Sequence, residues 1–283
     1  MNKKSTVLLL VLIFLSLAFS FCKKDSKQGT LFIIGGGKIS PEMIDKMILE
    51  SGLDKHGYGI ILPMSSEEPD SAIVEHKPGF VSQGCSNIFG VQFKKGEPWS
   101  DEKIDSIRNA SLVFISGGDQ SRFMSVIEGT PVKEAIHEAY SKGSMIAGTS
   151  AGASLMSKKM VTGNELKYPE NTGTFNSMES QNVEMISGLG LLETVIIDQH
   201  FIKRKRLNRL ISMCIENPDL LGIGIDEATA IFVDGNKATV YGVNQVVVVD
   251  NSHAVEKVEN GLLGVKSLKL GVFLPGESFT IKH

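Results

Sequence analysis

The sequence predicts an α/β fold: a mostly parallel sheet with helices on both faces and antiparallel strands added toward the C-terminus. Short apolar runs that end in turns alternate with helical patterns, which is typical of a covered parallel sheet. From Gly222 onward, strand signals are instead separated by turn pairs such as Asp234-Gly235. The 283 residues are 42% hydrophobic and 22% charged, so the composition is globular. We predict one domain over residues 30–283, because α/β folds of this size often form a single unit.

The N-terminus has the layout of a secretory signal. Lys3 and Lys4 precede an apolar stretch from residue 7 to residue 21 that is interrupted only by Ser16 and Ser20. A membrane span needs about 20 apolar residues, and this run is shorter. We therefore expect an exported protein whose leader is removed.

Two cleavage sites remain open at the end of this leader. Ala18 and Ser20 are small residues that suit a cut after Ser20. Alternatively, Cys22 followed by the polar tether of residues 23–29 resembles a bacterial lipoprotein, although Phe21 replaces the usual small residue. We favour this second interpretation: a signal peptide over residues 1–22, acylation of Cys22 and a location in the cell envelope. The other interpretation gives a soluble periplasmic or secreted protein.

The expected elements follow in order after the tether. Residues 30–34 predict a buried strand, and residues 35–37 are three glycines that predict a close turn into a helix capped by Ser40. The runs YGIILPM, LVFISGG, SMIAGTS and VIIDQH predict further strands, with helices such as PVKEAIHEAYSKG between them. Residues 161–188 are polar and weakly periodic, so we expect a surface loop there. Functional groups in such sheets gather where the strands end.

A GxSxG pattern places Ser150 between Gly148 and Gly152, directly after an apolar run. A sharp strand-to-helix turn of this kind lifts the serine oxygen into a cleft, where it can act as a nucleophile. The pattern alone is a weak signal, because a serine that caps a helix in a glycine turn would look the same.

A nucleophilic serine needs a base, and the base needs a group to orient it. His200 follows the apolar run TVIID, and the run LLGIGIDE ends in two candidate carboxylates, Asp226 and Glu227. We therefore expect serine, imidazole and carboxylate to stand at three strand ends on one sheet edge. Each residue alone could equally be an ordinary core or loop residue.

Charge and composition exclude several classes of function. The formal net charge is −3, which argues against a broad nucleic-acid surface. Cys85 and Cys214 show no CxxC spacing, and the histidines other than His200 show no metal-ligand spacing. We therefore predict no metal and no cofactor.

A local basic run follows His200. It contains Lys203, Arg204, Lys205, Arg206 and Arg209. Cations this close together repel one another, so we expect a negatively charged group nearby, and they should favour the neutral form of His200. The alternative is a solvated helix face, because apolar residues recur at helical spacing from Leu207 onward.

Ordered motifs across nearly the whole chain after the tether resemble the cyanophycinase family, a serine peptidase family that also includes aspartyl dipeptidases. The matching motifs are SGGDQ at 116–120, GTSAGAS at 148–154, GLGLL at 188–192, DQHF at 198–201 with three arginines after it, and GIGIDEATA at 222–230. This resemblance implies a fold similar to class I glutamine amidotransferases. It also implies that Ser150 is the nucleophile, His200 the general base and then acid, and Glu227 the residue that orients His200, with Asp226 less favoured. Gly117, Gly118 and Ala151 would supply the oxyanion hole.

The same resemblance implies a substrate. Cyanophycin is a polyaspartate whose side chains carry arginine through isopeptide bonds, so it is rich in free carboxylates. By position, the substrate-binding residues would be Gln120, Asp198, Gln199, Arg204, Arg206 and Arg209. We expect an exopeptidase that releases β-Asp-Arg dipeptides through an acyl-enzyme, contacts membranes only through its lipid and could form a homodimer. An aspartyl dipeptidase acting on small peptides and a non-catalytic binding lipoprotein are the alternatives.

Overall fold

The computed structural model describes residues 28–170, 175–252 and 256–281. The predicted leader, Cys22 and most of the tether lie outside these ranges. Within them, no helix combines the length and the apolar sequence that crossing a membrane requires.

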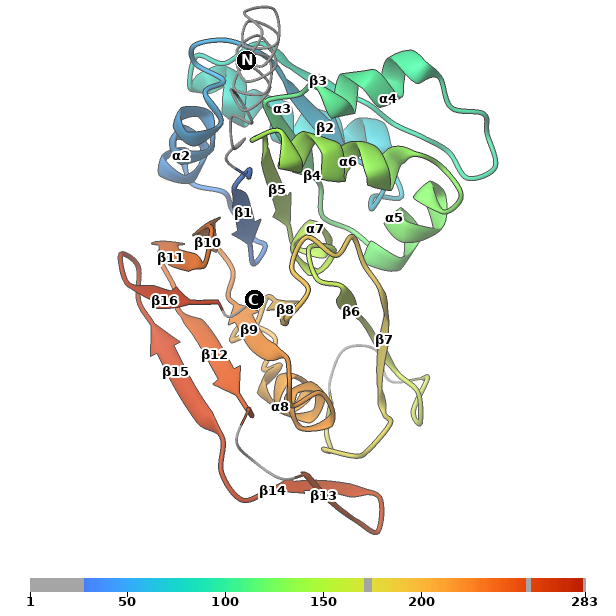
Figure 1. Ribbon diagram of the computed structural model, residues 1–283, viewed down its shortest axis with the longest axis vertical. Helices are drawn as coiled ribbons and strands as arrows, with labels where there is room; N and C mark the ends of the chain where they lie inside the picture. Colours follow the sequence, from blue (N-terminus) through green and yellow to red (C-terminus); the bar gives the residue numbers. More distant parts are fainter. Residues whose placement is uncertain (1–27, 171–174, 253–255, 282–283) are drawn as a thin grey trace, which may run out of the picture.

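The larger sheet has eight strands in the order β16-β11-β10-β1-β5-β4-β2-β3 (Figure 1). Its parallel part consists of β1 (Leu31–Ile34), β2 (Gly59–Leu62), β3 (Ile88–Gly90), β4 (Leu112–Ile115) and β5 (Met145–Thr149). Its antiparallel part consists of β10 (Thr229–Asp234), β11 (Lys237–Gly242) and β16 (Ser278–Thr280). The predicted runs YGIILPM, LVFISGG and SMIAGTS thus contain the buried parallel strands β2, β4 and β5.

Helices cover both faces of this sheet. They are α2 (Pro41–Ser51), α3 (Pro69–Ser82), α4 (Asp101–Arg108), α5 (Gln120–Ile127), α6 (Val132–Ser141) and the short α7 (Ala151–Ser154). Alternate residues of β1 enter two different cores: Leu31 and Ile33 pack with residues of α4 and α6, while Phe32 and Ile34 pack with residues of α2 and α3. The side chain of Ser40 accepts a hydrogen bond from the N–H of Met43, so the predicted helix cap is confirmed.

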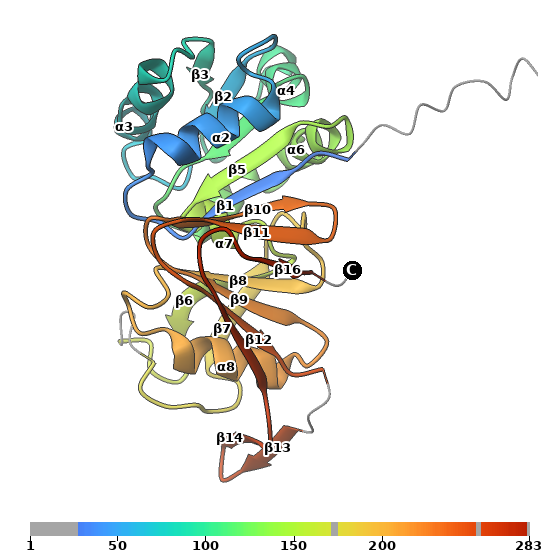
Figure 2. The same cartoon turned by 90° about the vertical axis from the view of Figure 1, so that its left-hand side faces the viewer.

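A second sheet of four strands has the order β15-β12-β9-β8. Its strands are β8 (Val195–Gln199), β9 (Leu221–Ile225), β12 (Val246–Asp250) and β15 (Lys269–Phe273), of which β8 and β9 are parallel. Helix α8 (Leu207–Glu216) packs on this sheet. Figures 1 and 2 place both at the end of the molecule away from α2, α3 and α4. Two hairpins complete the fold: β6 (Lys159–Glu165) with β7 (Val183–Ser187), and β13 (Glu256–Glu259) with β14 (Leu262–Val265).

The predicted fold class is confirmed, but two details of the prediction are wrong. Strands β10, β11 and β16 extend the edge of the first sheet as predicted, but β9, β12 and β15 form a separate sheet with β8. Strand β10 pairs directly with β1 and so extends the edge of the first sheet, while β9 pairs with β8 and β12. Gly222 and Gly224 let α8 and the turn before it pack closely on β9, because side chains there would meet Cys214 at 2.3 Å and Phe201 at 2.4 Å. The expected loop at 161–188 instead contains most of β6 and all of β7.

Candidate active site

Ser150 lies on a strained turn between β5 and α7. Its φ and ψ are 54° and −108°, a conformation that side-chain-bearing residues seldom adopt. The flanking glycines make this turn feasible, because a Cβ on Gly148 would lie 2.4 Å from the carbonyl oxygen of Gly152. The Ser150 side chain makes no capping hydrogen bond to α7. The helix-cap interpretation of the GxSxG pattern is therefore excluded.

The three predicted catalytic side chains form a continuous hydrogen-bonded chain. Ser150 Oγ lies 2.8 Å from His200 Nε2, and His200 Nδ1 lies 2.7 Å from Glu227 Oε1. A neutral imidazole that donates its Nδ1 proton to Glu227 leaves Nε2 free to accept the serine proton. Among the described residues, no hydrogen bond joins Asp226 to the ring, and its Oδ1 instead accepts hydrogen bonds from the backbone N–H groups of Ile202 and Lys203. Of the two neighbouring carboxylates, the structure thus joins Glu227 to His200.

These residues come from two sheets, which differs from the single sheet edge that we expected. Ser150 follows β5 of the larger sheet, whereas His200 and Glu227 follow β8 and β9 of the smaller one. The site is therefore built at the junction between the sheets.

The glycine turn at residues 35–37 joins the two sheets at this point. The carbonyl of Gly35 accepts the N–H of His200 at 2.7 Å, and that of Gly36 accepts the N–H of Ala228 at 2.8 Å. A Cβ on Gly36 would lie 2.3 Å from the His200 ring, and one on Gly37 would lie 2.9 Å from Glu227 Cβ. Sequence reasoning interpreted these glycines only as a strand-to-helix turn. Three consecutive glycines after the first strand were the signal that another chain segment comes this close.

The environment of His200 favours its neutral form. Burial is the largest cause that lowers the pKa of His200, the hydrogen bond to Glu227 opposes it, and the positive charges of Arg204 and Arg206 lower it further. The net effect is a pKa below the ordinary value of histidine. This agrees with the expected effect of the basic run, and a neutral imidazole is what a general base requires.

Two of the predicted oxyanion-hole residues, Gly117 and Ala151, lie beside Ser150. A Cβ on Gly117 would lie 3.9 Å from Ser150 Oγ, so the backbone of residue 117 borders the nucleophile. Gly118 adopts a φ of 132° and packs against the carbonyl of Ser65. Ala151 is the first residue of α7, so its N–H has no acceptor within the helix. The role of these three residues stays a prediction.

Asp198 supplies part of the negative charge that we expected near the basic run. Its Oδ2 accepts Nε of Arg209 at 2.9 Å, and its Oδ1 accepts Nη2 of Arg209. Asp198 is 0% exposed and Arg209 is 1% exposed. The structure thus places these two predicted substrate residues in a buried ion pair with each other.

Arg206 gives this network an excess of positive charge. Its Nη1 donates to the backbone carbonyl of Gln199 at 2.6 Å and to Oε1 of Gln199 at 2.8 Å, and it lies 3.7 Å from Asp198 Oδ1. Its Nε is buried without a hydrogen-bond partner among the described residues. Burial and the charge of Arg209 lower the pKa of Arg206 to about 10. Two guanidinium groups therefore share one carboxylate.

The other predicted substrate residues are placed differently. Gln120 is buried, and its Nε2 donates to the carbonyls of Val161 and Thr162 at 2.7 and 2.8 Å. The side chain of Arg204 is exposed. Among the six predicted substrate-binding residues, Arg204 is thus the one that solvent reaches freely.

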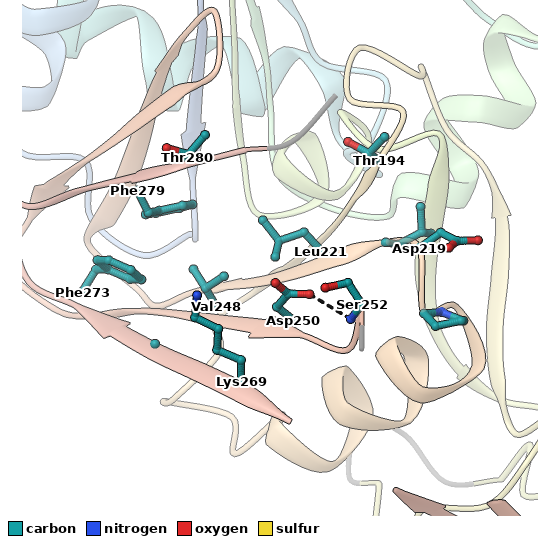
Figure 3. A pocket seen from close by; sticks show the side chains of 13 residues that line it. Thr194, Asp219, Leu221, Val248, Asp250, Ser252, Lys269, Phe273, Phe279 and Thr280 are labelled. Atoms are coloured by element: carbon teal, nitrogen blue, oxygen red, sulfur yellow. Dashed lines mark hydrogen bonds between the residues drawn. The ribbon is translucent and has the colours of Figure 1, made fainter. Parts of the chain in front are cut away.

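The structure also contains a separate pocket of about 420 Å³, which Figure 3 shows from close by. Leu221, Val248, Phe273 and Phe279 are among its apolar lining residues. It adjoins Thr194 and Leu221, at the ends of β8 and β9 opposite to those that carry His200 and Glu227. None of the predicted site residues lines it.

Comparison with known proteins identifies the family. The sequence profile of peptidase family S51 matches residues 31–241, which is more than half of the chain. The chain belongs to peptidase family S51. It is therefore a serine-type peptidase, and the resemblance found in the sequence is confirmed.

Curated and solved relatives of this S51 peptidase agree with that result. It is 33% identical over 266 residues to a cyanophycinase of a Nostoc species, covering 90% of this chain and 86% of the relative. A peptidase E of Actinobacillus pleuropneumoniae is 26% identical over 153 residues, or 50% of this chain and 59% of the relative. The crystal structure of a peptidase from an acI-B1 Actinobacterium superimposes with a TM-score of 0.64 at 21% identity, covering 91% of this chain and 98% of that one. This last likeness shows the shared fold.

Proposed function

We propose that this S51 peptidase is an exported exopeptidase that hydrolyses cyanophycin to β-Asp-Arg dipeptides. The observation that carries the proposal is the hydrogen-bonded chain from Ser150 through His200 to Glu227. The similarity to cyanophycinases over 90% of the chain supports the choice of substrate.

The geometry supports an acyl-enzyme mechanism. Ser150 Oγ attacks the scissile carbonyl carbon while His200 Nε2 takes the hydroxyl proton, and Glu227 stabilises the resulting imidazolium. The N–H groups near Gly117, Gly118 and Ala151 would donate to the oxyanion of the tetrahedral intermediate. That intermediate collapses as His200 gives its proton to the leaving amine. Water then attacks the acyl-enzyme by the same steps in reverse, which releases the acid and restores Ser150.

The charge excess of the basic run suits a substrate rich in carboxylates. A buried guanidinium without a full complement of acceptors gains most from an anionic ligand, and arginine binds carboxylates bidentately. We propose that Arg206 and the exposed Arg204 face the substrate. Asp198 and Arg209 satisfy each other, so in this proposal they hold Gln199 and Arg206 in place.

Incubation of the purified protein with insoluble cyanophycin tests the proposal. We expect the wild type to release the β-Asp-Arg dipeptide, as detected by mass spectrometry, and Ser150→Ala to release none. Ser154→Ala is a matched control, because Ser154 is a buried serine of the same short helix without a hydrogen-bond partner among the described residues. Absence of dipeptide with the wild type, or equal release by Ser150→Ala, would refute the proposal.

The partial match to peptidase E favours one alternative, an aspartyl dipeptidase that acts on small peptides. The two functions share the catalytic residues and differ in the substrate. A higher kcat/KM for aspartyl dipeptides than for a soluble cyanophycin oligomer would favour the dipeptidase. A non-catalytic binding lipoprotein has no need of the three-residue chain, so the geometry argues against it.

Export and lipid attachment belong to the same proposal, and their support is the N-terminal sequence alone. We propose that Cys22 carries the lipid that anchors the protein to the cell envelope. Fractionation should then recover the full-length protein with membranes until detergent is added, and Cys22→Ala should become soluble. Recovery of soluble wild type would contradict the anchor and leave the catalytic proposal intact.

A further inference from the structure

A compact turn over residues 200–206 carries both His200 and the exposed Arg204. The N–H groups of Arg204, Lys205 and Arg206 donate to carbonyls within the turn, at 2.9 to 3.0 Å. His200 and Lys205 both have positive φ values, 49° and 55°. This turn has no glycine and no proline. Contacts from outside must therefore hold it in this conformation.

The start of such a turn leaves N–H groups without acceptors inside it. Arg204 is the first residue whose N–H reaches a carbonyl of the turn, so the N–H groups of Ile202 and Lys203 need another acceptor. Oδ1 of Asp226 accepts both of them, at 3.1 and 2.9 Å. Asp226 is buried. It thus does for this turn what an N-cap residue does for a helix.

The segment that carries Asp226 is itself fixed on several sides. The N–H of Ala228 donates to Gly36, and the side-chain amide of Asn244 donates to the carbonyl of Glu227 at 2.8 Å. The N–H of Asn244 in turn donates to the side chain of Thr229 at 2.9 Å. Asp226 therefore offers a rigid acceptor to the turn.

We infer that Asp226 is a positioning residue for Arg204, and so sets the affinity for carboxylate-bearing substrates. This inference rests on the proposed function. Neighbouring carboxylates divide two tasks: Glu227 holds the imidazole ring, and Asp226 holds the backbone that precedes Arg204. Without Asp226, the ring keeps its contact to Glu227 and the backbone of His200 keeps its contact to Gly35. The loss should therefore appear in substrate binding and spare the reactivity of Ser150.

Three variants and two readouts test this inference. Asp226→Ala removes the acceptor, while Asp226→Asn keeps an oxygen at the same place, and Ser100→Ala removes the cap of α4 as a control for general destabilisation. The readouts are KM for a soluble cyanophycin oligomer and the rate of labelling by a serine-directed phosphonate that has no carboxylate. We expect Asp226→Ala to raise KM about 10-fold, which is the scale of a lost cap, with labelling within about 3-fold of wild type. Asp226→Asn and Ser100→Ala should keep KM within about 3-fold.

An unchanged KM in Asp226→Ala would overturn the inference, as would an Asp226→Asn variant that is equally impaired. If Asp226→Ala does not fold, hydrogen exchange of the Ile202 and Lys203 amides replaces it, with Asp226→Ser as the variant. These amides should be protected in wild type and exchange faster in Asp226→Ser, and equal protection would refute the inference. A wild type that fails to react with the phosphonate would count against the proposed triad, which is a separate result.

Discussion

The two ring nitrogens of His200 have different hydrogen-bond partners. Nδ1 meets Glu227 at 2.7 Å and Nε2 meets Ser150 at 2.8 Å, so the ring is oriented from both sides. Burial keeps the pKa of His200 low, while Glu227 stabilises its charged form. The residue can therefore be neutral at rest and still accept a proton during the reaction.

Replacing Glu227 by glutamine tests the orienting role. The amide can bind Nδ1 in the wrong tautomer and carries no charge to stabilise the imidazolium, so we expect kcat to fall on the order of 1,000-fold. Dipeptide release under saturating oligomer measures this. Asp226→Asn is the neighbouring control and should keep kcat close to wild type. A kcat for Glu227→Gln within about 3-fold of wild type would refute the role.

Replacing Arg204 by glutamine should move the acid limb of the pH profile. The charge of Arg204 lowers the pKa of His200, and only neutral His200 can act as the base. Removing that charge raises the pKa, so the decline of kcat/KM toward acid pH begins at a higher pH. The profile of Lys205→Gln is the comparison, because Lys205 is not among the groups that shift His200. An acid limb that stays in place or moves to lower pH would contradict this electrostatic account.

At the scale of elements, the turn of residues 35–37 decides how closely the two sheets approach. Residue 36 must be glycine for two reasons. Its φ is 102°, which residues with a side chain rarely adopt, and a Cβ there would collide with the His200 ring. The turn therefore belongs to the active site although it carries no functional side chain.

Gly36→Ala tests this close approach. The methyl group would displace the His200 ring, so we expect activity to fall by at least about 100-fold, as for other misplaced catalytic groups. Gly129→Ala is the matched control, because Gly129 has a φ of 71° but open space around its Cα, so it should show backbone strain alone. Equal activity of the two variants in the dipeptide assay would contradict the steric role of Gly36.

The junction between β8 and α8 contains the Asp198–Arg209 pair, and breaking it should destabilise the fold. Among the described residues, Arg209→Leu leaves the buried Asp198 carboxylate with Arg206 as its remaining cationic neighbour, so we expect a loss of about 3 kcal/mol or more in the free energy of unfolding. Urea unfolding measures this. The exposed pair of Lys257 and Glu259 is the control, and Lys257→Leu should cost less than about 1 kcal/mol. A small effect for Arg209→Leu would show that solvent reaches Asp198.

The strands and helix caps that depend on local sequence patterns could be predicted from the sequence. The strands that precede Ser150, His200 and Glu227 were visible as apolar runs, and the cap at Ser40 was visible from its residue types. The division into two sheets was not, because the pairing of β8 with β9 and of β10 with β1 is a choice between distant partners. The pairing of Asp198 with Arg209 could not be predicted for a similar reason. Asp198 lies on β8 and Arg209 on α8, and the fold brings the two side chains together.

At the scale of the whole molecule, the site exists only where the two sheets meet. Across this boundary the N–H of His200, after β8, donates to the carbonyl of Gly35, after β1, at 2.7 Å. Within the larger sheet, the N–H of Ser150 donates to the carbonyl of Ile34 at 3.0 Å. In the proposed mechanism, the larger sheet supplies the nucleophile, and the smaller one supplies the base, its carboxylate and the turn over residues 200–206. Figure 2 shows the two sheets as separate layers, and the site requires that they keep their relative position.

The labelling of the whole protein by a serine-directed phosphonate tests the central claim most directly. Peptide mapping by mass spectrometry should find one adduct, on Ser150, and His200→Ala should slow its formation on the order of 1,000-fold because the base is gone. An adduct on another residue, or unchanged labelling of Ser150 in His200→Ala, would contradict the account.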